Sequence, residues 1–173
     1  TTVPRVDAYR HLGTWMSALG GLKTAREGVE RRCRGLVAAV ARLGVLNAAQ
    51  YVEAVDIGTT SVVAYYGAAT PLGRPVCEAI DAAKRVGLAA LGHRLWRTGR
   101  WLAHAPPAEG GMGMAYTYAH AAATLAEAVD RGLRAQEGVP IRTAVVTAIE
   151  RRYWELGCRM ARPLDWHPMH ILG

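Results

Sequence analysis

Phenylalanine is absent from the 173 residues, and lysine contributes only two of the 21 basic side chains. The aromatic surface must therefore come from Tyr and Trp, whose polar tips suit wet interfaces. The positive charge comes almost entirely from Arg, whose planar guanidinium matches phosphate oxygens and stacks on flat rings. About half of the residues are apolar, which excludes a disordered tail and predicts a chain that buries a core.

Cysteine is scarce and widely spaced. Cys33, Cys77 and Cys158 form no C-x-x-C pair, which argues against a disulfide framework and for a reducing, intracellular compartment, either nuclear or cytoplasmic. Long apolar runs are missing as well. The longest uncharged run, residues 57–73, is short and is broken by Gly, Pro and a Thr-Thr-Ser sequence, so we expect no transmembrane helix and no membrane partner.

The basic residues come in blocks. Residues 1–47 carry eight basic and three acidic side chains, whereas residues 48–73 carry no basic one. Residues 74–104 carry six basic against two acidic, and residues 105–130 again carry no basic one. A GC-rich genome would favour arginine along the whole chain. The uneven placement instead predicts a nucleic-acid partner, with a formal net charge of +7 to attract it.

Apolar residues recur at helical spacing in three successive stretches, residues 22–43, 48–66 and 75–92, and a glycine follows or ends each stretch. The first stretch has a basic face and an opposite apolar face. The apolar face consists of Ala25, Val29, Cys33, Leu36, Val37, Val40 and Leu43. The second stretch contains only two charged residues, so we expect it to be the most buried of the three.

The ends of these stretches carry capping signals. Gly44 should stop the first helix, and Asn47 should begin the second, with Gln50 at the capping-box position. Pro75 suits the first position of the third helix because its missing N–H is not needed there. Short connections between three helices predict a compact antiparallel bundle.

Gly28 and Gly35 lie two turns apart on the first helix, between its apolar and basic faces. Glycine inside a helix costs about 1 kcal/mol relative to alanine, so a close approach by another group should offset that cost. The approaching group is either another helix or a sugar–phosphate backbone.

Residues 93–104 interleave three Arg and two Trp without any acidic residue. In one interpretation the Trp side chains cap the bundle and the Arg side chains are solvated. In the other, Arg94, Arg97 and Arg100 contact phosphates while a Trp stacks on a base.

A turn-forming segment, residues 106–114, follows this stretch, and two more helices are expected at residues 116–134 and 140–159. No strand precedes the Gly-Gly-Met-Gly run in this segment and no Lys-Ser/Thr follows it, so we expect a turn that docks the next helix rather than a phosphate loop. With a β-prone stretch at residues 3–16, the sequence predicts a mainly α chain: a short N-terminal β-hairpin, a three-helix bundle and a further pair of helices.

Three motifs, in order, carry a family resemblance. The first is an aromatic–Leu-Gly–aromatic pattern formed by Tyr9, Leu12, Gly13 and Trp15. The second is Tyr66-Gly67 at the end of the second helix, and the third is Pro-Ala-Glu-Gly-Gly-Met-Gly-Met at residues 107–114. Over about residues 6–135 the chain resembles the C-terminal third of non-LTR (LINE-type) retrotransposon reverse transcriptases, which place a primer-grip hairpin before a helical thumb. Residues 136–173 match no pattern of that family.

The resemblance implies a division by role: the end of the palm with the primer grip in residues 1–20, a thumb-like helical bundle in 21–92 and a C-terminal helical connection region in 93–173. It implies a segment that grips an RNA–DNA or RNA template–primer duplex, with its first helix near the minor groove, and that works beside the rest of the polymerase chain. Basic helices supply phosphate contacts, and an A-form duplex offers a wide, shallow minor groove. The expected nucleic-acid-binding residues are Tyr9, His11, Leu12, Gly13, Lys23, Arg26, Arg31, Arg34, Arg94, Arg97 and Arg100.

Clustered carboxylates for polymerase chemistry are missing, because no two Asp residues are adjacent. We therefore expect this segment to be no enzyme by itself, to hold no catalytic residue and no cofactor, and to leave Mg²⁺ to the missing catalytic half. Cys158, His167 and His170 have the chemistry of zinc ligands, but their spacing fits no tetrahedral set, so we expect surface histidines and no metal site.

A rival interpretation belongs to a different class of protein. In it the chain is a helical protein–protein interaction or oligomerisation module, and its arginine bias is incidental. Its apolar second and fourth helices would then bury a partner or a second copy of the chain.

Overall fold

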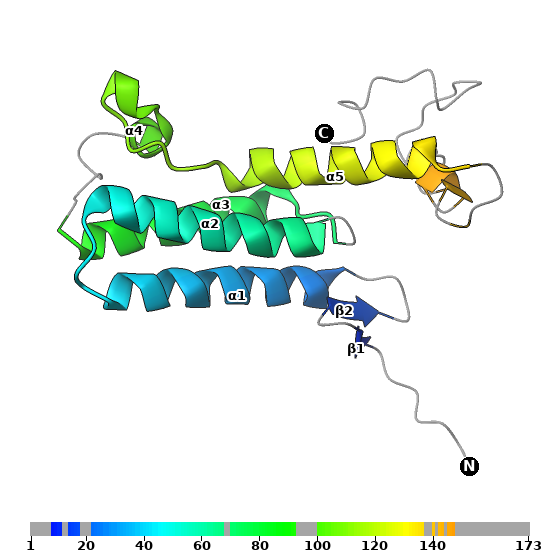
Figure 1. The fold of residues 1–173 in the computed structure, drawn as a ribbon. Helices are drawn as coiled ribbons and strands as arrows, with labels where there is room; N and C mark the ends of the chain where they lie inside the picture. The colour runs from blue at the N-terminus through cyan, green and yellow to red at the C-terminus, as the bar shows by residue number, and fades with distance from the viewer. Residues whose placement is uncertain are drawn as a thin grey trace, which may run out of the picture. The chain divides into compact units, whose positions relative to one another are not determined.

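The structure is a computed structural model that describes residues 8–11, 14–17, 22–67, 70–92, 100–136, 140, 142–143 and 145–147, the first two ranges as backbone alone. The described part is mainly helical (Figure 1). The chain forms two compact units, Thr1–Ala121 and Ala122–Gly173, and the division falls within a single helix. The three segments predicted from sequence, with boundaries at 20/21 and 92/93, divide the chain by role and not by compactness, and they stay predictions.

Three helices make up most of the first unit: α1 (Lys23–Arg42), α2 (Ala48–Gly67) and α3 (Arg74–Ala90). They lie side by side and successive helices run in opposite directions (Figure 1). Their bounds agree with the stretches predicted from apolar spacing. Strands β1 (Ala8–His11) and β2 (Thr14–Ser17) precede α1 and pair antiparallel.

The core of this unit lies between the three helices. On α1 the buried residues follow one row at four-residue spacing and are Ala25, Val29, Cys33 and Val37. The prediction that α2 is the most buried helix is not confirmed, because α2 buries seven of its 20 residues and α3 buries the same share, six of 17, against four of 20 on α1. The inward placement predicted for Leu43 is wrong. Leu43 follows the last residue of α1 and is 60% exposed, whereas the row of buried residues on this helix ends at Val37.

The predicted capping box at the start of α2 is confirmed. The backbone N–H of Gln50 donates to Oδ1 of Asn47 at 3.0 Å, and the backbone N–H of Asn47 donates to Oε1 of Gln50 at 3.1 Å. Gly44 stops α1 in a left-handed conformation with φ +68°. Each of these features depends only on residues close together in the chain.

Replacing Asn47 by alanine should remove one cap hydrogen bond and lower the free energy of unfolding by about 1 kcal/mol. Asn47→Ser should restore most of this loss, because a serine hydroxyl also accepts the bond. Urea denaturation measures the effect, with Glu53→Ala on the exposed side of the same helix as control. Equal stability of the Asn47→Ala and Asn47→Ser variants would contradict a capping role.

Close helix packing occurs at glycines other than Gly35. Among the described residues, nothing lies within 4 Å of a Cβ placed on Gly35, so of the two alternatives for the approaching group, no helix of the described part is the one at this position. A Cβ on Gly58 would lie 2.6 Å from Cδ1 of Leu36, and one on Gly87 would overlap the hydroxyl of Tyr51. The missing side chains of Gly58 and Gly87 therefore let α2 approach α1 and let Tyr51 of α2 reach α3.

The chain continues through α4 (Arg100–His104), the 3₁₀ turn η2 (Pro107–Glu109) and α5 (Thr117–Arg134). In the second unit a Cβ on Gly132 would meet Cγ2 of Val145 at 2.6 Å. Nη1 of Arg142 donates to the carbonyl of Ala135 at 3.3 Å. The described residues of the helix predicted at 140–159 are helical up to residue 147, and residues 148–159 lie outside the described part.

None of the helices in the described ranges combines the length and the apolar character that a membrane span needs.

Candidate nucleic-acid interface

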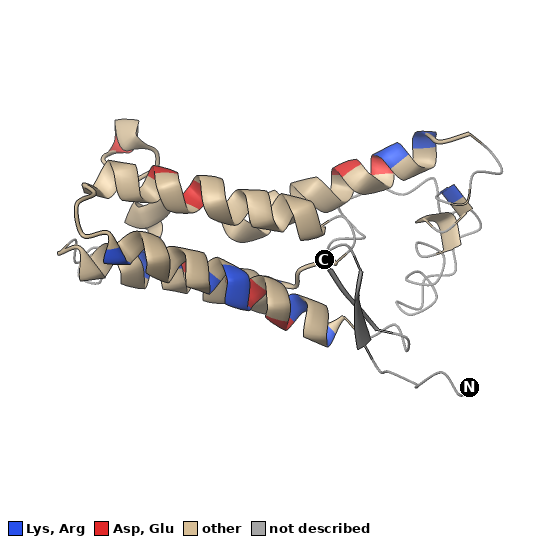
Figure 2. Ribbon diagram, turned by 60° about the horizontal axis from the view of Figure 1, so that its bottom comes forward, with Lys and Arg blue, Asp and Glu red and all other residues tan. Residues whose placement is uncertain are grey.

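The outward face of α1 combines arginines with small residues. Arg31, Gly35, Ala38 and Arg42 succeed one another at spacings of three and four, which places them on one side of the helix, and all four are exposed. Figure 2 shows Lys and Arg along the whole of α1, whereas α2 carries only acidic charges. The result is a helix face with guanidinium groups at both ends and the small residues Gly35 and Ala38 between them.

The α1 residues predicted to contact phosphate differ in their exposure and in the contacts that they make within the protein. Lys23 and Arg31 are exposed. Arg34 pairs with Glu30 at 3.1 Å one turn away, and because this surface pair is worth little, a phosphate can replace the carboxylate. Arg26 is half-buried, and its Nε donates to the carbonyl of Pro71 at 2.8 Å. Arg26 therefore ties α1 to the loop before α3 and has less freedom to reach a ligand.

Arg32 was not anticipated from the sequence. Its Nη1 donates to the hydroxyl of Tyr66 at 2.9 Å, which joins α1 to the Tyr-Gly motif at the end of α2. This contact helps to hold α1 against α2 while its outward face stays open.

The remaining predicted binding residues lie away from α1. Arg100 is exposed and begins α4. Tyr9 and His11 lie on β1, where the structure describes only the backbone. The other four lie outside the described residues: Leu12, Gly13, Arg94 and Arg97.

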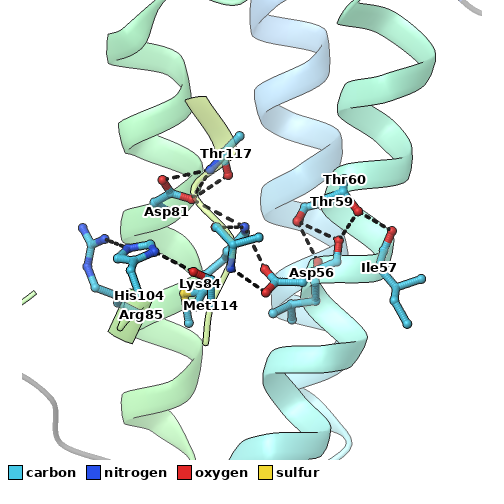
Figure 3. A network of polar contacts seen from close by, with 12 residues as sticks. Asp56, Ile57, Thr59, Thr60, Asp81, Lys84, Arg85, His104, Met114 and Thr117 are labelled. Atoms are coloured by element: carbon cyan, nitrogen blue, oxygen red, sulfur yellow. Dashed lines mark hydrogen bonds and ion pairs between the residues drawn. The ribbon is translucent and has the colours of Figure 1, made fainter. Parts of the chain in front are cut away.

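A buried ionic cluster lies between α2 and α3. Lys84 has no exposed surface, and its Nζ lies 3.0 Å from Oδ1 of Asp56 and 3.5 Å from Oδ1 of Asp81. The same ammonium group donates to the carbonyl of Ala115 at 3.1 Å. Figure 3 shows Lys84 reaching from α3 toward Asp56 on α2. Three partners around one buried ammonium group satisfy its donors, which a buried charge requires.

This cluster fastens the segment that leads into α5. The backbone N–H of Ala115 donates to Oδ2 of Asp56 at 2.7 Å, and the N–H and hydroxyl of Thr117 both donate to Asp81. A carboxylate that accepts from the first turn of a helix stabilises that turn. Met114, only 1% exposed, enters the core beside this site. The prediction that the Gly-rich turn docks the following helix is therefore confirmed.

The sequence contains a signal for part of this cluster that the apolar periodicity alone does not identify. Lys84 occupies a place on the core-facing stripe of α3 between Ile80 and Gly87, where a lysine is anomalous unless it is paired. Asp81 stands one turn before it, and Asp56 is one of only two charged residues in α2. The sequence does not show that Lys84 and Asp56, which are 28 residues apart in the chain, face each other across the helices.

The buried thiols beside the cluster are not nucleophiles. Burial raises the pKa of Cys33 to about 12, although Lys84 works against this rise. Burial and the nearby Asp81 raise the pKa of Cys77 to about 11. Both groups are free thiols and stay protonated at neutral pH, so they act as small apolar core residues.

The α4 region holds a second group of exposed basic and aromatic side chains. Trp101 is 61% exposed and does not cap the bundle, whereas Trp96, the other tryptophan of that interpretation, lies outside the described residues. The rings of His104 and Tyr116 are stacked, with centroids 3.8 Å apart and planes at 12°. Nδ1 of His104 donates to the carbonyl of Met114 at 2.9 Å, and Nη1 of Arg85 lies 3.5 Å from Nε2 of the same ring (Figure 3).

No three His, Cys, Asp or Glu side chains come together as metal ligands within the described ranges. Cys158, His167 and His170, considered as zinc ligands from the sequence, lie outside those ranges.

No protein-family model matches this sequence, and no curated protein or solved structure matches it either. The features that indicate a function are the arrangement of exposed side chains on α1 and α4 and the contacts that position them.

Proposed function

We propose that this chain is the thumb and C-terminal segment of a retrotransposon reverse transcriptase and that it grips the template–primer duplex through α1. The observation that carries the proposal is the exposed face from Arg31 to Arg42, where no group approaches Gly35 within 4 Å of its Cβ position. Glycine inside a helix is unfavourable, and no residue in the described part of the chain packs closely enough to explain it at this position. Contact with a ligand surface would give one.

The chemistry of this face suits a duplex close to A-form. The wide and shallow minor groove of such a duplex exposes sugars and 2′-hydroxyls, against which a helix with small side chains can lie flat. Arg31 and Arg42 are three turns, or roughly 16 Å, apart along the helix, so they reach well-separated phosphates. Such contacts provide affinity with little dependence on sequence, which is what a polymerase thumb needs.

The rest of the chain takes its role from the same proposal. The β1–β2 hairpin is the primer grip at the end of the palm, and α1 to α3 form the thumb. The chain has no nucleotidyl-transfer activity of its own, and the catalytic carboxylates with their Mg²⁺ ions belong to the remainder of the polymerase. The compartment is intracellular and reducing, because the polymerase acts on nucleic acid there.

The double variant Arg31→Ala plus Arg34→Ala should bind an RNA–DNA duplex more weakly. The slope of log affinity against log salt concentration should become shallower by about 1 for each phosphate that the variant no longer binds. Fluorescence anisotropy with a labelled hybrid duplex at several salt concentrations measures both quantities on the full chain.

The matched control is Arg131→Ala plus Arg134→Ala on α5. It removes the same charge from arginines that pair with carboxylates one turn away, as Arg34 does. A loss of affinity with both changes would point to net charge alone. An unchanged salt slope in the Arg31/Arg34 variant would count against the α1 interface.

Exposed apolar side chains support a second candidate, an oligomerisation or protein-interaction module. Val45 is 84% exposed beside Leu43, and Ile57 and Tyr65 on α2 are each 62% exposed. Sedimentation velocity over a range of concentrations, with and without duplex, separates the two functions. The module would self-associate and ignore the duplex, whereas the thumb segment would bind the duplex without needing a second copy.

A further inference from the structure

The stacked rings of His104 and Tyr116 form a rigid flat surface on the outside of the first unit. His104 is held at both ring nitrogens, by the Met114 carbonyl and by Arg85. Tyr116 stacks on this fixed ring and is still 53% exposed. Since one face of the Tyr116 ring is covered by His104, its exposed area belongs to the other face and to the edges.

The exposed residues near this stack on α4 are basic and aromatic, and the carboxylates that bond the residues on either side of Tyr116, those of Asp56 and Asp81, are paired with Lys84. Trp101 lies one turn before His104 on α4, and Arg100 next to it is exposed. Residues 100–116 contain a single acidic residue, Glu109, which lies on the turn η2. Packing of α4 is provided by other side chains, because Ala103 is fully buried and Met114 is only 1% exposed. The aromatic rings outside are therefore not needed to cover the core.

We propose that the His104–Tyr116 stack, with Trp101 beside it, is a platform on which unpaired nucleobases stack, with Arg85 and Arg100 contacting the adjoining phosphates. Nucleobases stack favourably on aromatic side chains whatever their identity, and a basic rim attracts the backbone that carries them. A protein partner would not require the arginines that we assign to phosphate contacts, Arg85 and Arg100. The platform extends the proposed function, on which it rests, by adding a site for the single-stranded part of the nucleic acid.

The platform is separate from the duplex face. In Figure 1, α4 lies on the opposite side of α2 and α3 from α1. Variants on one surface therefore leave the other surface intact, and the two sites can be tested independently.

The test compares a labelled 12-nucleotide single-stranded RNA with an abasic strand of the same length and charge, by fluorescence anisotropy on the full chain. The chain should bind the base-bearing strand more tightly. The double variant Trp101→Leu plus Tyr116→Leu should show roughly tenfold weaker affinity for the base-bearing strand and bind the abasic strand as before. Tyr116→Phe, which keeps the ring, should behave like the unchanged chain.

The single variant Trp101→Leu changes a largely exposed residue, so it tests the platform even if the double variant folds poorly, which thermal unfolding would reveal. Equal binding of the base-bearing and abasic strands, or unaltered binding by Trp101→Leu and the double variant, would overturn the platform. Loss of duplex binding in Arg31→Ala plus Arg34→Ala with the preference for bases intact supports both sites. The same preference with no duplex binding by the unchanged chain supports the platform and rejects the thumb.

Discussion

Replacing Lys84 by methionine is expected to lower the free energy of unfolding by about 3–5 kcal/mol, the largest effect of any substitution proposed for this protein. Methionine keeps the apolar length of the side chain, so the loss comes from the ammonium group. Without it, the carboxylates of Asp56 and Asp81 are left beside each other in a buried site, and the carbonyl of Ala115 loses its donor.

Urea denaturation followed by circular dichroism measures this loss. The control is Arg74→Ala, also on α3, where the ion pair between Arg74 and Glu78 is exposed and should contribute less than about 1 kcal/mol. Adding Asp56→Asn and Asp81→Asn to Lys84→Met should recover part of the stability, because the uncompensated charges are removed together. A Lys84→Met variant no less stable than Arg74→Ala would contradict the role of the cluster.

Gly87→Ala should lower the free energy of unfolding by about 2 kcal/mol, although alanine is the better helix former. The new methyl group would overlap the hydroxyl of Tyr51 and lie 3.3 Å from Cγ1 of Val37. The ring of Tyr51 is fully buried and its hydroxyl donates to the carbonyl of Lys84 at 3.0 Å, so it has little room to retreat. Overpacking of this kind costs about 1–3 kcal/mol.

Gly35→Ala is the matched control for Gly87→Ala. Both changes gain about 1 kcal/mol of helix propensity, but the methyl group at Gly35 meets nothing within 4 Å. Gly35→Ala should therefore stabilise the protein, and the two variants should differ by about 3 kcal/mol in chemical denaturation. Adding Tyr51→Phe to Gly87→Ala removes the nearest clashing atom and should restore part of the loss. Equal stability of the two alanine variants would show that α3 and Tyr51 adjust freely.

The sequence predicted the helices of the first unit well, because each depends on a repeating local pattern. The apolar row from Ala25 to Val37 identifies the buried face of α1, and the Asn47–Gln50 capping box identifies the start of α2. The same reasoning failed for Leu43, because periodicity alone does not say where a neighbouring helix stops covering the face.

Only part of the candidate interface could be predicted from the sequence. The arginines of α1 follow from charge patterning along one helix. That Arg26 turns to the carbonyl of Pro71, 45 residues along the chain, depends on a tertiary neighbour that a charge pattern does not define. Gly35 shows the same limit, since a glycine in a helix marks a close approach or an open face, and the pattern is identical for both.

Features that require only residues one or two turns apart were therefore decided by the amino-acid order: helix bounds, caps and the basic side of α1. The buried cluster of Asp56, Lys84 and Asp81, and the His104–Tyr116 stack, join positions on different elements and exist only because the helices pack in one particular arrangement. The physical reason is that a hydrogen bond within a turn needs only local backbone geometry. A buried charge or a stacked ring needs the whole bundle to bring its partner within a few ångströms.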